Sequence, residues 1–178
     1  LCDVDYGERQ ACVNINKGED YTNMNLIKKD HIGWGYKKEN TGYHQVWEEK
    51  LPKIFTKIKN LCGLEMSGIA LLRQDPGNIN PWHYDTHLGV VRKNNLKGDE
   101  IKKIKRYLIF LDDWHWGHYV QVGNSVLAHW KKGDIYTWDY GMYHLSCNAG
   151  IVKKFTSQVT GIPGKNALHL SNEYSFYL

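Results

Sequence analysis

The sequence has no apolar run approaching the roughly 20 residues that a membrane-spanning helix needs, and no secretory leader is visible at its start. Its four cysteines are too few for a disulfide framework in 178 residues, and none forms a Cys-x-x-Cys pair typical of structural zinc sites. The net charge of +4 is not gathered into a basic face. These absences predict a cytoplasmic protein with reduced thiols, and we expect neither membrane nor nucleic acid as a partner.

The chain also lacks repeats, low-complexity tracts and linkers, and its length suits one domain with one core. We therefore predict a single domain over residues 1–178. Flanking strands and a helix are expected in 1–63, a strand-rich core in 64–161 and a C-terminal extension in 162–178.

One helix is predicted near residues 44–62, because apolar side chains recur there at spacings of three and four and would line one helical face. Pro52 is expected to split or restart this helix, and Gly63 stands where a C-terminal cap belongs. The apolar positions are Trp47, Leu51, Ile54, Phe55, Ile58 and Leu61.

From Leu64 onward the period becomes that of strands, with Gly-rich turns at regular intervals. Aromatic residues make up 13% of the chain, which suits the interior of a β-structure. A mainly β sandwich or barrel is the expected fold. The clearest predicted strands are 67–73, 106–111, 118–122, 125–130, 135–139, 143–146 and 154–161.

Two metal-binding side chains stand two positions apart in His83-Tyr84-Asp85. On an extended strand they share one face, so an imidazole and a carboxylate can converge on one ion. His144, on a later strand, is the leading candidate for the third ligand. Two histidines and one carboxylate form the facial triad of non-haem Fe(II) oxygenases, which leaves positions open on the metal. A His-x-Asp pair alone is weak evidence, so the interpretation depends on its surroundings.

A basic residue follows His144 at a distance of ten, since 144 + 10 = 154. Lys154 opens an alternating strand on which Thr156 shares its face. A cation beside a hydroxyl donor suits a carboxylate ligand. The plainer interpretation is a surface lysine beside Lys153.

In their order and spacing, His83, Asp85, His144 and Lys154 resemble the motif of the Fe(II)/2-oxoglutarate-dependent oxygenases, and the resemblance spans residues 67–161. Lysine at the last position, like the Pro76-Gly77 turn, is similar to the prolyl 4-hydroxylase branch. The stretch from Trp130 to Asp139, with His144 and Asn148, resembles aspartyl/asparaginyl β-hydroxylases instead. Those proteins often lack the triad carboxylate, which is present here as Asp85, and its presence also argues against the halogenating branch.

This resemblance implies a double-stranded β-helix of the jelly-roll or cupin type, with the early helix outside one sheet. It implies Fe(II) held by His83, Asp85 and His144, with 2-oxoglutarate and dioxygen as cosubstrates and ascorbate as a candidate reductant. Lys154 would grip the far carboxylate of 2-oxoglutarate and Thr156 would donate nearby. Arg106 or Tyr107, which open the strand after the charged loop, would reach the cosubstrate.

The implied activity is hydroxylation coupled to release of succinate and CO2. A peptide or amino-acid substrate is slightly favoured over a small metabolite, and the charged loop 92–105 is a candidate lid. Two alternatives remain open: a metal-dependent cupin enzyme that does not use 2-oxoglutarate, and a non-catalytic jelly-roll binding protein. The histidines outside the motif are discounted as ligands and at most contact the substrate; these are His87, His115, His118 and His129.

Overall fold

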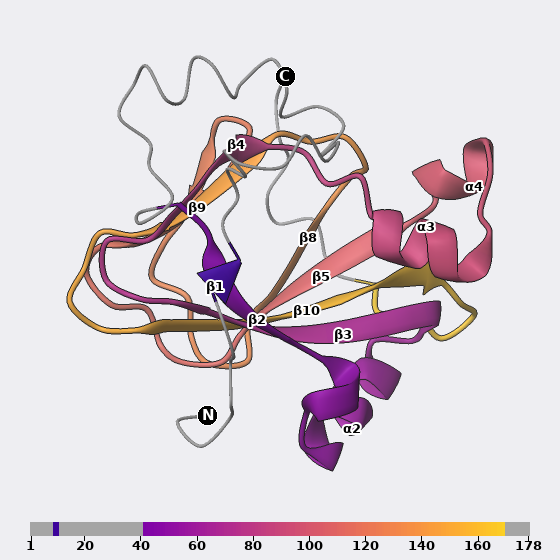
Figure 1. The fold of residues 1–178 in the computed structure, drawn as a ribbon, viewed down its shortest axis with the longest axis horizontal. Coiled ribbons are helices and arrows are strands. Elements are labelled where there is room, and N and C mark those ends of the chain that lie inside the picture. The colour runs from indigo at the N-terminus through magenta and orange to yellow at the C-terminus, as the bar shows by residue number, and fades with distance from the viewer. Residues whose placement is uncertain (1–8, 11–40, 170–178) are drawn as a thin grey trace.

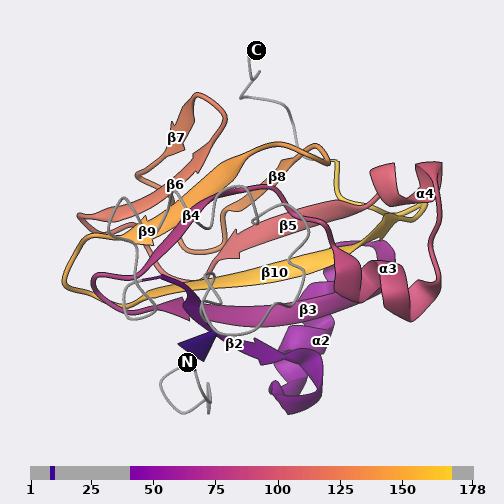
Figure 2. The ribbon, with the colours of Figure 1, turned by 45° about the horizontal axis from the view of Figure 1, so that its top comes forward.

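The computed structural model describes residues 9–10 and 41–169, which form ten strands and four short helices (Figures 1 and 2). In chain order they are β1 (Arg9–Gln10), β2 (Tyr43–Trp47), η1 (Glu48–Lys50), α2 (Lys53–Leu61), β3 (Leu64–Gln74), β4 (Ile79–His83), α3 (Leu88–Asn94), α4 (Asp99–Lys102), β5 (Lys105–Phe110), β6 (His118–Val122), β7 (Ser125–Leu127), β8 (Ile135–Trp138), β9 (His144–Asn148) and β10 (Lys154–Pro163).

The strands form two antiparallel sheets with the orders β1-β2-β3-β10-β5-β8 and β4-β9-β6-β7. Within β3–β10 the pairing is nested, since β3 pairs with β10, β4 with β9, β5 with β8 and β6 with β7. A chain paired in this way is one long hairpin wound into two facing sheets, which is the eight-stranded double-stranded β-helix or jelly roll. The mainly β fold expected from the sequence is therefore confirmed.

The period of two along the strands divides the side chains of the large sheet between two cores. On β5, Tyr107 and Ile109 belong to an outer core with Phe55 of α2, while Leu108 and Phe110 belong to the core between the sheets. On β10, the register opposite β5 pairs Thr156 with Phe110 and Thr160 with Arg106. The face of β10 that carries Lys154, Thr156 and Thr160 therefore points between the two sheets.

The helix predicted near 44–62 is only partly correct. Residues 43–47 form β2, which pairs with β3, and the α-helix spans Lys53–Leu61 after Pro52 at its N-cap. Sheet pairing prevails over the helical pattern because Val46, 3% exposed, lies opposite Leu71 in the outer core. Trp47, by contrast, is 52% exposed. Helix α2 covers the outer side of the large sheet, as Figures 1 and 2 show.

Gly63 ends α2 at a position that only glycine tolerates. Its φ is +64°, and a Cβ there would lie 2.0 Å from the carbonyl oxygen of Asn166. Two hydrogen bonds hold the same two segments together. The amide of Gly164 donates to the carbonyl of Gly63, and the amide of Leu168 donates to the carbonyl of Cys62. The chain after β10 is thereby attached to the end of α2.

Within the charged segment 92–105, α3 ends and the short helix α4 follows, at one end of the molecule (Figures 1 and 2). Helix α3 contacts β3 and follows the predicted ligand Asp85 directly in the chain. Within the described residues, no helix is long and apolar enough to cross a membrane. The assignment of 1–178 to a single domain stays a prediction. Residues 1–8 and 11–40, which belong to the segment 1–63 where flanking strands are expected, lie outside the described residues.

Candidate metal centre

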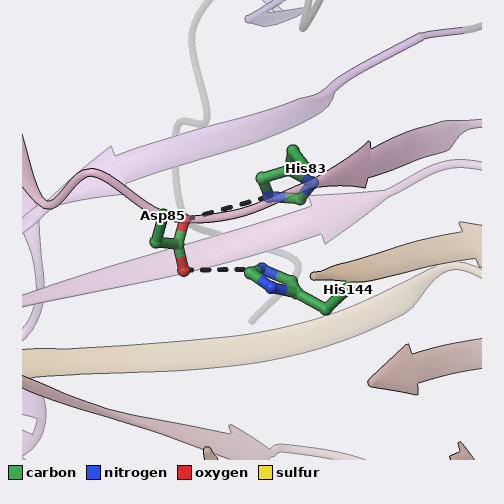
Figure 3. Close-up of side chains that lie close together, drawn as sticks. All are labelled: His83, Asp85 and His144. Carbon is green, nitrogen blue, oxygen red and sulfur yellow. Dashed lines mark ion pairs between the residues drawn. The ribbon is translucent and has the colours of Figure 1, made fainter. Parts of the chain in front are cut away.

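The three predicted ligands meet at the end of the barrel where β4 finishes and β9 begins (Figure 3). One ligand atom from each of His83, Asp85 and His144 can be chosen so that all three lie within 4.8 Å of one another. Pairing of β4 with β9 sets His83 directly opposite His144, and their ring centroids are 4.3 Å apart. Strand β4 ends at His83, so Asp85 arrives from the irregular segment after it rather than from the strand that we expected.

Backbone carbonyls fix the orientation of both imidazoles. His83 Nδ1 donates to the carbonyl of Pro81 over 2.7 Å, and His144 Nδ1 donates to that of Met142 over 3.0 Å. A carbonyl only accepts, so in each neutral ring Nδ1 carries the hydrogen and Nε2 carries the lone pair. This is the outer-shell hydrogen bond that metal-binding histidines usually make.

Both Nε2 atoms face the Asp85 carboxylate. His144 Nε2 lies 3.4 Å from Oδ2 and His83 Nε2 lies 3.8 Å from Oδ1, as the dashed lines in Figure 3 mark. When both rings are neutral, their Nε2 lone pairs and the carboxylate are all acceptors, and a cation between them would relieve their repulsion. Asn80 Nδ2 lies 3.3 Å from His83 Nε2 and donates to the same lone pair. The donor set therefore fits a divalent metal, which would replace the Asn80 contact.

The surroundings of His83 and Asp85 keep these two side chains in the protonation states that a metal requires. Burial, with the nearby His144, lowers the pKa of His83 to about 4, so its ring is neutral near pH 7. Burial alone would raise the pKa of Asp85, but Arg106 and the two histidines hold that pKa well below its usual range. The side chains of His83, Asp85 and His144 are 16%, 15% and 6% exposed.

Arg106 and Tyr107, one of which was predicted to reach a cosubstrate, point to opposite faces of β5. Arg106 Nη1 donates to Asp85 Oδ2 over 2.6 Å, and its Nε donates to Thr160 Oγ1 over 3.0 Å. Tyr107 lies in the outer core, and its hydroxyl donates to the carbonyl of Leu168. The structure therefore brings Arg106 to the triad and Tyr107 away from it, which corrects the expectation for Tyr107.

Lys154 is 3% exposed at the start of β10, so its interpretation as a surface lysine is wrong. Its ammonium donates to Tyr119 O over 2.6 Å, to Ser146 Oγ over 2.8 Å and to Cys147 O over 3.3 Å. No carboxylate among the described residues forms an ion pair with it, and burial lowers the pKa of Lys154 to about 7. Thr156, 8% exposed, follows on the same face of the strand.

His87, which we discounted as a ligand, lies beside the triad. Burial and the charge of Arg106 lower its pKa to about 3, with smaller effects from Asp85 and His144. Its backbone is left-handed, with φ +52°, and its Nδ1 is buried without a hydrogen-bond partner. The spacing of four from His83 was visible in the sequence, but its irregular backbone was not.

Two of the discounted histidines, His118 and His129, make contacts outside the triad. His118 Nε2 bonds the carbonyl of Val152, and the His129 ring packs on Trp114. Trp116 is 83% exposed. Trp138 differs, because its ring lies 4.7 Å from that of His144 and so forms part of the wall of the metal centre.

No protein-family model matches the sequence. No curated protein matches it significantly either. The structural neighbours are cupin and double-stranded β-helix proteins. They include an uncharacterized conserved protein with a double-stranded β-helix domain from Klebsiella pneumoniae, at 19% identity and a TM-score of 0.37, where the match covers 57% of this chain and 70% of that one.

Two further neighbours match 67% of this chain. A protein described as a predicted oxalate decarboxylase from Thermotoga maritima is 14% identical over 80% of its own chain, with a TM-score of 0.42. A Cupin 2 conserved barrel domain protein from Salinispora arenicola is 10% identical over 75% of its chain, with a TM-score of 0.41. Because these TM-scores are low, we assign the fold from the strand order of this protein and not from its similarity to these structures.

Proposed function

We propose that this protein is an Fe(II)- and 2-oxoglutarate-dependent dioxygenase that hydroxylates a substrate and releases succinate and CO2. The observation that carries the proposal is the orientation of the two imidazoles, whose Nδ1 atoms donate to backbone carbonyls while their Nε2 lone pairs face Asp85. Two histidines and one carboxylate leave several positions of an octahedral ion open. Fe(II) bound there would supply the reduction of dioxygen that inserts one oxygen atom into a substrate C–H bond and the other into succinate.

Lys154 supports 2-oxoglutarate as the cosubstrate. Ser146, which accepts a hydrogen bond from Lys154, is two residues from His144, so both side chains project from one face of β9. That step is about 7 Å along a strand. A dicarboxylate that binds the metal with one end would bring its other carboxylate to the buried ammonium. Charge neutralisation would then offset the cost of burying Lys154, and Thr156 could donate to the same group.

The remaining residues would serve the same site. The Trp138 ring excludes water from one side of His144. His87 lies near Asp85 and Arg106, with a buried ring nitrogen that a polar group of the substrate could reach. The substrate we favour stays a peptide or amino acid rather than a small metabolite, and the segment 92–105, which contains α4, stays a candidate lid.

One observation favours a second function, a metal-dependent cupin enzyme that does not use 2-oxoglutarate. All three N–H groups of the Lys154 ammonium have acceptors on this chain, namely Tyr119 O, Ser146 Oγ and Cys147 O. The lysine could then serve to join β10 to β6 and β9 without any ligand. A cosubstrate carboxylate has to displace at least one of these acceptors.

Anaerobic titration distinguishes the two functions. Metal-free protein is mixed with Fe(II) and then with 2-oxoglutarate, and visible absorption is recorded. We expect a metal-to-ligand charge-transfer band in the wild type, and its loss in His144→Ala and Lys154→Ala. His115→Ala, which changes an exposed histidine outside the triad, is the matched control and should keep the band. Tight iron binding without a band would reject 2-oxoglutarate and leave the second function, whereas no iron binding would reject both.

A further inference from the structure

Arg106 holds one particular oxygen of the triad carboxylate. Its Nη1 donates to Asp85 Oδ2 over 2.6 Å, while Oδ1 of the same carboxylate faces His83 Nε2 at 3.8 Å. The two oxygens therefore have different surroundings. Oδ2 accepts from a charged donor at close range and also lies 3.4 Å from His144 Nε2, whereas Oδ1 has no hydrogen-bond donor that the structure records among the described residues.

A second hydrogen bond fixes the Arg106 guanidinium on the side away from Asp85. Its Nε donates to Thr160 Oγ1 over 3.0 Å, and Thr160 lies directly opposite Arg106 in the pairing of β5 with β10. At the other edge of β5, the hydroxyl of Thr137 on β8 donates to the backbone carbonyl of Arg106. The Arg106 side chain is 17% exposed. A planar, delocalised group held at Nε has little freedom to turn with the carboxylate, so Asp85 has to align with it.

The number of oxygens that Asp85 gives to a metal matters for the open positions. A carboxylate that chelates through both oxygens occupies two positions on the ion, whereas one oxygen occupies a single position. We propose that Arg106 is a positioning residue whose hydrogen bond to Oδ2 of Asp85 holds that oxygen away from the metal. Oδ1 is then the sole carboxylate ligand of the metal. With two imidazoles, three positions then stay open rather than two.

This inference rests on the metal centre of the proposed function, but it does not need 2-oxoglutarate. It also gives Arg106 a different role from contact with the cosubstrate, which we expected from the sequence. The two roles separate in the absence of cosubstrate, where only the hold on Asp85 can affect the ion.

The test counts water molecules on bound Mn(II), a paramagnetic ion that favours oxygen and nitrogen ligands in octahedral geometry. Water-proton relaxation enhancement is measured at saturating protein without any organic ligand, after the Kd for Mn(II) has been determined for each variant. The variants are Arg106→Gln and Arg106→Met, of which the second fills similar space with an apolar chain. Arg73→Gln is the matched control, because Arg73 pairs with Asp75 outside the triad.

In the wild type, three open positions hold water, and in both Arg106 variants we expect two. The enhancement per bound Mn(II) should therefore fall by roughly one third, while Arg73→Gln leaves it at the wild-type value. Equal enhancement in the wild type and the folded Arg106 variants would overturn the inference while the metal centre stands. A fall of the same size in Arg73→Gln would also overturn it. Failure of the wild type to bind Mn(II) would overturn the metal centre and this inference with it.

Discussion

The ammonium of Lys154 donates to Ser146 Oγ over 2.8 Å, two residues along β9 from the metal-binding candidate His144. A buried cation and a metal centre thus share one interior face of the barrel. No carboxylate of the described residues neutralises this cation. The relationship makes the proposed cosubstrate site sensitive to pH, because a carboxylate ligand needs the charged form of the lysine.

The first prediction is that 2-oxoglutarate binds more weakly as the pH rises above 7. Burial lowers the pKa of Lys154 to about 7 in the free protein, so above that value binding must be accompanied by proton uptake. The apparent Kd should rise by about fiftyfold between pH 7 and pH 9, most steeply above pH 8. Calorimetry of the metal-loaded, oxygen-free protein in buffers of different ionisation enthalpy measures both the Kd and the proton uptake.

Lys154→Arg is the matched variant for this prediction. A guanidinium stays charged throughout this range, so the pH dependence between 7 and 9 should disappear even if the larger group lowers the affinity. An affinity of the wild type that does not change between pH 6.5 and 9 would contradict the role of Lys154 as the carboxylate anchor.

The second prediction concerns the metal ligands. His144→Ala removes a side chain that supplies a lone pair, whereas loss of an outer-shell partner typically weakens metal binding by about 10- to 100-fold. We therefore expect the Kd for Co(II) or Mn(II) to rise by more than about 100-fold in His144→Ala. His115→Ala should match the wild type. A normal Kd in His144→Ala would mean that the three side chains do not share an ion.

Much of this site could be predicted from local sequence. The alternation along 154–160 correctly grouped Lys154 with Thr156, because every second residue of a strand shares a face. The order of His83, Asp85 and His144 suggested a shared ion, and the structure brings them within 4.8 Å. Outer-shell hydrogen bonds to both histidines were expected, but their acceptors could not be named from the sequence, although each is the carbonyl two residues before its histidine. Carbonyl direction depends on the backbone around the bulge in β4, which side-chain patterns do not reveal.

The errors arose where two patterns competed. Trp47 and Leu51 fitted a helical face, but pairing of β2 with β3 buried Val46 and Pro52 set the start of α2. Tyr107 was named beside Arg106 because the family resemblance left open which of the two reaches the cosubstrate. Both faces of β5 carry apolar residues, so alternation could not decide which face is inside. When both faces of a strand are buried, both carry apolar residues, so the sequence does not indicate which face points between the sheets.

The third prediction is that the metal-free protein loses stability as the pH falls below 6.5. The folded pKa values of His83 and His87 are lowered to about 4 and about 3, whereas the unfolded value is 6.5. Protons then bind preferentially to the unfolded chain, and each histidine costs about 1.4 kcal/mol per pH unit at most. Urea unfolding at pH 7 and pH 5 measures the loss.

His87→Asn isolates one of the two histidines. Asparagine tolerates the left-handed backbone at φ +52° and does not titrate. The loss of unfolding free energy between pH 7 and pH 5 should therefore be smaller than in the wild type by about 1–2 kcal/mol. An identical loss in both proteins would mean that the His87 ring is accessible to protons in the folded state.

The fourth prediction separates backbone strain from steric conflict in two glycines with left-handed backbones. Gly77 has φ +81° with nothing within 4 Å of a built Cβ, so Gly77→Ala should cost only the strain of about 1–2 kcal/mol. Gly63 has φ +64° and a Cβ that would lie 2.0 Å from Asn166 O, so Gly63→Ala must also displace the chain from the end of α2. We expect its unfolding free energy to fall by at least about 3 kcal/mol, in the range of severe mutations.

This conflict lies on the outer side of the large sheet, because the displaced chain includes Leu168, which accepts the hydrogen bond from Tyr107. Arg106, on the opposite face of β5, does not contact it. The folded fraction of Gly63→Ala should therefore bind Mn(II) with a Kd within about threefold of the wild type, because changes at distant sites with no shared contacts are usually independent. A Kd that rises together with the loss of stability would mean that the outer core sets the position of Arg106, and that Tyr107 acts on the metal centre through its strand.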